Sequence, residues 1–241
     1  MIALTFWLFS RYEFTKLAFL YFLNIFGPLT LSIEKDSFLS KSFFPFAEAM
    51  LEKYRFDYSI AGITADYKLS SSETSKYGFI PFPLIWGWAT WSRSWNGYSL
   101  YLKDFNKNQL SGYVKSLPKN QKKYWISNFE RIKKSNIPHT WDFQYSYLVM
   151  QRNQNFIHPF TNLVSNQGFN SEATHTKNPF DKFSNLDLGL ILKPYKADIK
   201  TTKYANYLSK NLFVHKSFIL KIFIVFKNWI RAIIIKFLQD G

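Results

Sequence analysis

Apolar residues between positions 29 and 63 occur first as a short run, then at helical spacing, then as a short run again. "LTLSI" at 29–33 and "YSIAGI" at 58–63 are brief apolar runs typical of buried strands. Between them, Phe43, Ala47 and Leu51 recur every four residues, which predicts an amphipathic helix that ends near Tyr54. The order strand, helix, strand predicts an α/β architecture with helices packed on a sheet.

A cluster of tryptophans follows, in "LIWGWATWSRSWNGY" at residues 84–98, which holds four of the eight tryptophans of the chain. Trp86 and Trp88 flank Gly87 in the alternating pattern of an extended segment. The other two tryptophans are four residues apart, which is typical of a helix, so "ATWSRSW" is predicted to start one. An aromatic junction of this kind can line a ligand pocket, or it can be a corner of the core.

The second half of the chain alternates polar helices with short apolar runs. "KNQKKYWISNFERIKK" at 119–134 predicts a helix with a lysine-rich face, which is most often simply solvated. Residues 140–154 suit a more buried helix, and residues 156–169 a short strand followed by a loop. The serine-rich segment at 64–78 is predicted to be a loop. These elements together predict a mixed α/β domain with a partly parallel sheet.

Both ends of the chain carry long apolar stretches, and neither has the pattern of a membrane span. Residues 17–33 are uncharged but short, and Gly27 and Pro28 interrupt them, which predicts a buried helix, a turn and a buried strand; a membrane anchor is the alternative. Residues 213–241 contain five Lys or Arg, too many for a span. Such a basic, apolar helix is typical of the surface of an anionic membrane; the alternative is a helix packed on the domain with its lysines directed outward.

The formal charge of +15 is concentrated near the C-terminus, because residues 193–241 hold ten Lys or Arg against two Asp, a net of +8. We therefore predict two regions, an α/β domain at 1–190 and a basic, apolar helical extension at 191–241. The absence of cysteine excludes disulfides and thiolate metal ligands, and it is consistent with a reducing compartment. Basic residues beside aromatic ones suit single-stranded nucleic acid, but the aromatic residues follow a core pattern, so no nucleic-acid partner is predicted.

Two carboxylates, Glu34 and Asp36, directly follow the apolar run at 29–33. They are predicted to lie on the loop at the C-terminal end of a strand, where open α/β sheets bind ligands. A pair of carboxylates on a tight turn can hold a hard divalent cation, and that cation can neutralise a substrate diphosphate. A solvated surface turn is the commoner role for such a sequence.

Asp142 and two histidines are the other candidates for chemistry. Asp142 begins the apolar helix in "HTWDFQYSYL", where it can be a base or simply complement the helix dipole. His158 and His175 could ligate a metal or contact phosphate, although scattered histidines are more often ordinary loop residues.

Four segments resemble, in their order and spacing, a bacterial family of nucleotide-diphospho-sugar transferases, some of whose members are described as hemolytic proteins. The resemblance covers roughly residues 18–178. The segments are "IEKDSFLSKSFFPFAEAMLEKYRFDYSIAGI", "IWGWATWSRSW", "TWDFQYSYLVMQ" and "PFTNLVSNQGFNSEATHT". Their order is also distantly similar to that of N-acetylglucosaminyltransferase I-type enzymes.

The resemblance implies a GT-A glycosyltransferase fold, with a mostly parallel sheet flanked by helices. It places Glu34 and Asp36 at an acidic motif that binds Mn²⁺ or Mg²⁺ and the diphosphate of the sugar donor, with His175 as a further candidate metal ligand. It places Asp142 as the catalytic base. The tryptophan corner of Trp86, Gly87 and Trp88 then lines the sugar or acceptor pocket.

The implied activity is transfer of a hexosyl or N-acetylhexosaminyl group, with inversion, from a nucleotide-diphospho-sugar to a surface glycan or a lipid-linked acceptor. The basic C-terminal helix would hold such an enzyme on the cytoplasmic face of a bacterial membrane.

The chain departs from the family pattern at two places. Lys35 replaces a carboxylate of the family's Glu-Asp-Asp motif, which bears on metal use. Only about 33 residues precede the motif, so part of the N-terminal nucleotide-binding half is expected to be missing. The competing hypothesis is a non-catalytic protein, either a truncated remnant or a membrane-associated interaction protein.

Overall fold

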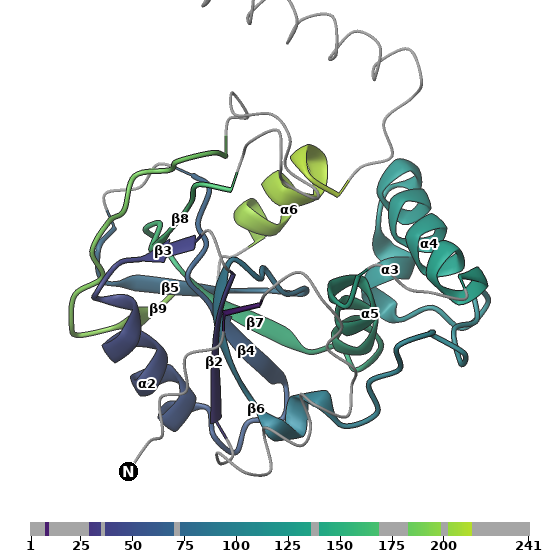
Figure 1. The fold of residues 1–241 in the computed structure, drawn as a ribbon, viewed down its shortest axis with the longest axis horizontal. Coiled ribbons are helices and arrows are strands. Elements are labelled where there is room, and N and C mark those ends of the chain that lie inside the picture. The colour runs from purple at the N-terminus through teal and green to yellow at the C-terminus, as the bar shows by residue number, and fades with distance from the viewer. Residues whose placement is uncertain are drawn as a thin grey trace, which may run out of the picture.

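The computed structural model describes residues 8–9, 29–34, 37–69, 73–135, 140–168, 183–198 and 202–213 (Figure 1). The helices are α2 (Phe43–Lys53), α3 (Gly112–Ser116), α4 (Lys119–Lys134), α5 (Asp142–Gln151) and α6 (Thr202–Asn211), with a 3-10 turn, η1, at Ser92–Trp95. The strands are β1 (Leu8–Phe9), β2 (Leu29–Glu34), β3 (Ser37–Leu39), β4 (Ile60–Thr64), β5 (Lys76–Ile80), β6 (Gly87–Trp91), β7 (Asn155–Pro159), β8 (Val164–Asn166) and β9 (Lys196–Ala197).

One mixed sheet organises the domain, with the strand order β1-β2-β6-β4-β7-β5-β9. The outermost strands, β1 and β9, have two residues each, so five longer strands form its body. Strand β6 is antiparallel to both β2 and β4, and β5 is antiparallel to β7. The α/β class and a mixed, partly parallel sheet are therefore confirmed, but the sheet is not mostly parallel, because β6 is antiparallel to both of its neighbours and β5 is antiparallel to β7.

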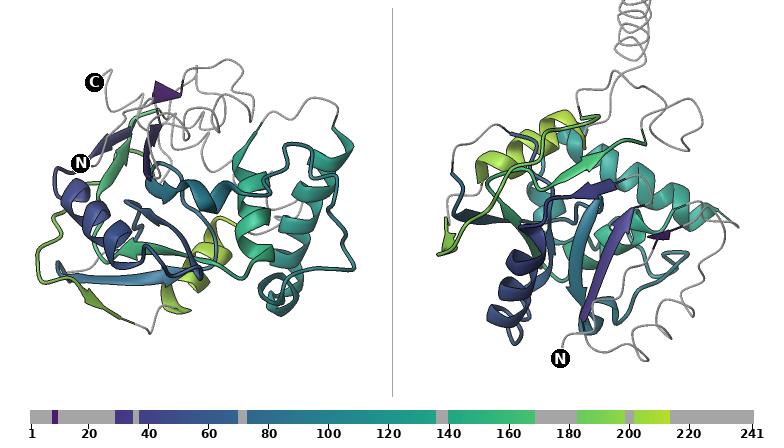
Figure 2. Two further views of the ribbon diagram at one scale, coloured as in Figure 1. Left: turned by 90° about the horizontal axis from the view of Figure 1, so that it is seen from below. Right: turned by 60° about the vertical axis from the view of Figure 1, so that its left-hand side comes forward.

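Helices cover both faces of this sheet (Figure 2). Helix α2 packs on one face through Phe43, Phe46 and Met50, which belong to a core cluster with Ile63 and Ile157 of the sheet. On the other face a larger cluster joins the sheet to α3, α4, α5 and α6. The apolar periodicity that predicted helices at 43–54 and 119–134 is thus the set of positions that each helix buries against the sheet or its neighbours.

The tryptophan segment is more extended than its local pattern predicted. Strand β6 continues through Trp91, where a helix was expected to have begun, and only the four residues of η1 are helical. Every residue of β6 is buried, and both of its edges pair with neighbouring strands. Backbone hydrogen bonds on two sides therefore outweigh the helical spacing of Trp91 and Trp95.

The described residues of the predicted C-terminal extension belong to the packed body. Ile191 is 2% exposed, and from α6 Tyr204 is 2% and Leu208 is 0% exposed. Strand β9 also pairs with β5, which ties this segment to the sheet. The remainder of the extension, including the predicted membrane-surface helix, lies outside the described residues. Within the described residues, no helix is both long and apolar enough to cross a membrane.

Gly62 in β4 provides a test of how tightly the sheet is packed. A Cβ at this position would lie 2.6 Å from Cζ of Phe156 and 2.8 Å from the backbone oxygen of Ala89. We expect Gly62→Ala to lower the free energy of unfolding by about 1–3 kcal/mol, because a backbone atom cannot move aside as a side chain can. Gly112→Ala is the control, since its nearest atom is 3.7 Å away and alanine favours a helix. Urea unfolding of both variants measures the difference; equal stabilities would contradict the packing.

Candidate functional site

Three strands end at the same edge of the sheet. Strands β2 and β4 are each antiparallel to β6, so they run in the same direction, and β7 is parallel to β4. Their last residues are Glu34, Thr64 and Pro159. The carboxyl ends of parallel strands are where α/β sheets commonly bind ligands, so this edge is the candidate site.

The two sequence motifs predicted to bind the donor meet at this edge. Glu34 ends β2, and Ile33 pairs with Gly87, the first residue of β6. The antiparallel register therefore brings the chain after Ile33 alongside Trp86. Lys35, Asp36 and His175 lie outside the described residues, so the proposed acidic motif and metal ligands stay predictions beyond Glu34.

The start of α5, with Asp142, contacts the sheet through Trp141, which lies against both Trp88 and Trp95. Only residues 152–154 separate α5 from β7, so the chain reverses and the first turn of α5 returns toward the carboxyl end of that strand. Next to Asp142, the ring of Trp141 stacks on Trp88, with centroids 5.7 Å apart and an interplanar angle of 21°. Trp88 in turn pairs with Ser32 of β2 and Thr64 of β4, near the ends of both strands.

Two tyrosines lie within electrostatic reach of Asp142. Burial is the main reason that the pKa of Tyr124 is raised to about 12, and the charge of Asp142 raises it further. The pKa of Tyr98 is also raised, first by burial and then by Asp142. Its hydroxyl donates a hydrogen bond to the backbone oxygen of Trp141, at 3.3 Å. Asp142 is thus a partly exposed carboxylate beside two phenols that stay neutral at physiological pH.

The tryptophans divide into core residues and one edge residue. Trp88, Trp91 and Trp95 are 5% exposed or less, and Trp95 stacks on Tyr145 of α5 at 4.3 Å. These three rings belong to the core. Trp88 also holds the ring of Trp141 in place by stacking on it. Trp86 is partly exposed at the strand edge, so it is the member of the cluster that can contact a ligand.

Gly87 lies against side chains on the face of the sheet that α2 covers. A Cβ at this position would lie 2.5 Å from Cδ2 of Leu39 and 3.4 Å from Cβ of Ala65. The closer atom is the end of a flexible leucine side chain, which can move aside, so packing alone does not exclude a small residue here.

An ion pair that the sequence reasoning missed lies beside Trp86. Lys68 Nζ is 2.6 Å from Oδ2 of Asp66, and both side chains are 3% exposed. The same ammonium lies 3.7 Å from the centroid of the Trp86 ring and 5.0 Å from that of Phe183. The pair therefore lies next to the partly exposed ring of Trp86, just after β4 ends.

A signal for this pair was present in the sequence. Asp66 follows an apolar strand, as Glu34 does, and the same rule about carboxyl ends of strands applies to both. The local pattern does not reveal the pair, because "ADYK" merges into the serine-rich segment that its composition predicts to be a loop. That segment also contains the start of β5 at Lys76, so its polar composition concealed a strand as well.

His158 is buried at the end of β7 and is surrounded by aromatic rings. It is 0% exposed and stacks on Tyr67 at 5.5 Å with an interplanar angle of 7°, and Tyr204 of α6 lies 4.7 Å away. Burial lowers the pKa of His158 to about 4, although a hydrogen bond with the Pro159 oxygen opposes the shift. His158 is therefore a neutral core residue under α6.

His158 should make the fold sensitive to acid. Its pKa is about 6.5 in the unfolded chain and about 4 in the folded one, so the unfolded state binds more protons between these values. Above pH 6.5 the imidazole is neutral in both states, so it does not lower the free energy of unfolding. As the pH falls from 6.5 toward 4, protonation of the unfolded chain lowers the free energy of unfolding by about 3 kcal/mol in total.

The measurement is urea unfolding of the native protein and His158→Phe between pH 7 and pH 4. The variant keeps an aromatic ring and every carboxylate, so the difference between the two profiles isolates the imidazole. We expect the variant to lose much less stability across this range. Parallel profiles would show that His158 is protonated in the folded state.

No metal cluster of three or more His, Asp or Glu is found in the part of the chain that the structure describes. The predicted ligands Asp36 and His175 are outside that part, as stated above. A function can therefore be based on the partly exposed Trp86, the carboxylate of Asp142 and the Asp66–Lys68 pair. For Glu34 the structure gives the backbone position at the end of β2.

Comparison of the chain with models of protein families gives no match, and comparison with curated proteins gives none either.

Proposed function

We propose that this chain is a glycosyltransferase domain with a GT-A-like fold. It would transfer a sugar from a nucleotide-diphospho-sugar to a surface glycan or lipid-linked acceptor on the cytoplasmic face of a bacterial membrane. The sequence resemblance motivates the reaction class. The arrangement of the described residues at one sheet edge supports it.

The observation that supports the proposal is that three separate segments come together around Trp88 of β6, near the carboxyl ends of β2 and β4. These are the end of β2 at Glu34, the start of β6 at Trp86 and the start of α5 at Asp142. They are far apart in the sequence, and the family resemblance assigns each a role in donor or acceptor binding. Their meeting follows from the strand register and from the stacking of Trp141 on Trp88.

In this proposal Asp142 removes a proton from the acceptor hydroxyl while that oxygen attacks the anomeric carbon of the donor. The sugar–phosphate bond breaks, and the nucleoside diphosphate leaves with the bonding electrons. Trp86 offers an aromatic face to the C–H surface of a sugar. Bound Mn²⁺ or Mg²⁺, held by Glu34 and Asp36, would supply positive charge to the leaving diphosphate.

A non-catalytic interaction protein is the second candidate, and Lys35 is the observation that favours it. A lysine between Glu34 and Asp36 places a cation where the family has a third carboxylate. That substitution weakens the attraction of the turn for a divalent metal ion.

Ligand-induced thermal stabilisation tests the proposal. The full chain is screened against a panel of nucleoside diphosphates and nucleotide sugars, with Mn²⁺ or with EDTA. We expect at least one nucleotide sugar to raise the melting temperature, and Lys35→Asp to strengthen the Mn²⁺-dependent part of the shift. No stabilisation by any member of the panel under either condition would favour the non-catalytic candidate.

A further inference from the structure

The segment that forms α3, α4 and the loop before them carries a dense positive charge. Residues 103–134 hold nine Lys or Arg against two Asp or Glu, a net of +7 out of the +15 of the whole chain. All but Lys122 are exposed, and Lys122 is partly exposed. We call these residues the basic face: Lys103, Lys107, Lys115, Lys119, Lys122, Lys123, Arg131, Lys133 and Lys134.

The geometry of α4 directs most of this charge outward. Trp125, Phe129 and Ile132 are buried against the core at 2% exposure or less. At 100° per residue, the five lysines of α4 lie within a stripe about 120° wide and about 24 Å long, whose centre is about 115° around the helix from these buried residues. The apolar side of the helix is already occupied by the core, so the helix cannot rotate to cover these lysines. The five are Lys119, Lys122, Lys123, Lys133 and Lys134.

The charge of this face is not balanced within the described part of the chain. The ion pairs found there belong to Arg55, Lys68 and Lys76, so none involves the basic face. Its two carboxylates, Asp104 and Glu130, line a groove beside α4. Like charges at i and i+4, such as Lys119 and Lys123, repel each other and weaken a helix.

We propose that the basic face docks on an anionic lipid bilayer. Eight of its nine cations are lysines, which act as mobile point charges, whereas specific recognition of a phosphate or a base favours the planar fork of arginine. The cations are spread over two helices and a loop, which suits a diffuse anionic plane. The attraction is electrostatic, because α4 buries its apolar side in the protein, and it does not require the apolar C-terminal segment.

Docking in this way would orient the proposed active site. Helices α4 and α5 lie side by side, with Tyr124 6.1 Å from Phe143 and Phe129 5.2 Å from Tyr147. The later residue of α4 contacts the later residue of α5, so the two helices run in the same direction. The first half of α4 is therefore beside Asp142, and a lipid-linked acceptor would approach from the membrane. This orientation rests on the proposed function, whereas the binding itself does not.

Cosedimentation of the full chain with vesicles tests the binding. We expect association with vesicles containing phosphatidylglycerol but not with neutral phosphatidylcholine, and weaker association as salt is raised. Neutralising Lys115, Lys119, Lys123 and Lys134 to glutamine should lower the affinity at least about tenfold, since each lysine near an anionic surface contributes to binding. The control neutralises the same number of exposed cations elsewhere, Lys41, Arg55, Lys193 and Lys196, and should change the affinity less than about twofold.

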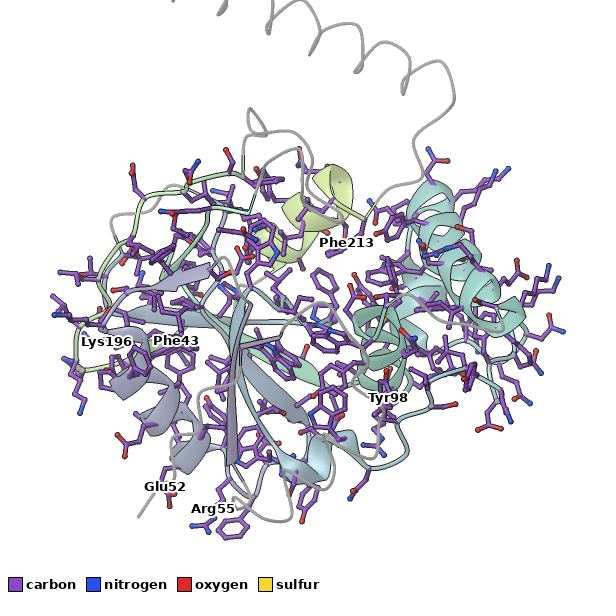
Figure 3. All side chains as sticks on the ribbon, in the orientation of Figure 1. Phe43, Glu52, Arg55, Tyr98, Lys196 and Phe213 are labelled. Atoms are coloured by element: carbon purple, nitrogen blue, oxygen red, sulfur yellow. The ribbon has the colours of Figure 1, made fainter. Side chains whose placement is uncertain are left out.

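A site-specific label distinguishes this face from other basic parts of the chain. The chain has no cysteine, so a fluorophore can be attached at Asn120→Cys on α4 or at Glu52→Cys at the end of α2. These helices lie on opposite sides of the molecule, and Glu52 points outward (Figures 1 and 3). We expect lipids with a nitroxide headgroup to quench the label at position 120 and not the label at position 52.

Three outcomes would overturn the proposal. Equal losses of affinity in the two neutralised variants would attribute the binding to net charge alone. Quenching at neither position, or equally at both, would place the contact elsewhere. Binding to soluble polyphosphate or to nucleic acid without binding to vesicles would identify a different polyanion as the partner. Failure of donor binding in the thermal assay would leave this inference unaffected.

Discussion

Asp142→Asn should lower the turnover number for sugar transfer at least about 100-fold while donor affinity stays nearly unchanged. General-base catalysis typically contributes a factor of about 10²–10⁴, and the amide cannot accept the proton of the acceptor. The substitution keeps the size of the side chain, so Trp141 should still stack on Trp88. Initial rates with the nucleotide sugar identified by thermal stabilisation, together with donor titrations, measure the two effects separately.

If Asp142 only stabilises the helix through its dipole, a different result is expected. A carboxylate in the first turn of α5 also interacts favourably with the helix dipole, and its loss would cost about 0.3–1 kcal/mol of stability. If that were its whole role, Asp142→Asn would lower stability slightly and leave the turnover number unchanged. Asp187→Asn is the matched control, because Asp187 is exposed and its loss should change neither quantity.

Local periodicity predicted helices α2 and α4 well, but it did not predict α3 or α6. The helix expected at 119–134 has the bounds of α4, and the pattern of Phe43, Ala47 and Leu51 marks α2. In both cases the apolar residues report burial of one side of a helix, and the information lies within the segment itself. Such elements can be read from one sequence because their hydrogen bonds are internal.

Strands and their directions depended on distant partners. Strand β5 was hidden in a polar segment because β7 and β9, its partners, follow it by many residues. Strand β6 extends to Trp91 because β2 and β4 hold both of its edges. No local pattern states whether a strand is parallel or antiparallel, which is why the sheet was expected to be more parallel than it is.

The site was predictable in part for the same reasons. Glu34 and Asp142 occupy ends of elements, and their positions follow once the strand and the helix are recognised. The contacts of Lys68 with Trp86 and Phe183 join residues up to 115 positions apart, so the sequence does not indicate them. The ion pair could be suspected from Asp66 at a strand end, but its burial follows only from tertiary packing.

The Asp66–Lys68 pair should have the largest effect on stability among the charged groups of the site. Lys68→Met removes the cation 2.6 Å from a carboxylate that is 3% exposed. Breaking a buried pair from one side typically costs about 3–5 kcal/mol, because the remaining charge is neither solvated nor compensated. We expect a loss of this size in the free energy of unfolding measured with urea.

The double variant Asp66→Asn with Lys68→Met should recover most of that loss. It removes both charges, and replacing a buried pair by neutral groups of similar size is often close to neutral. Lys76→Met is the control for the loss of a lysine, since Lys76 pairs with Glu73 at the surface, with side-chain exposures of 36% and 48%. A surface pair contributes about 0–1 kcal/mol, so this variant should remain nearly as stable as the native protein.

The same set of variants separates a structural pair from one that serves the site. Lys68 lies 3.7 Å from the ring centroid of Trp86, so removal of the cation also removes a contact that holds this ring at the sheet edge. If Trp86 contacts a sugar, the double variant should regain stability but bind the donor more weakly than the native protein. Full recovery of both quantities would assign the pair to folding alone. A double variant as unstable as Lys68→Met would show instead that an uncompensated charge is not the cause of the loss.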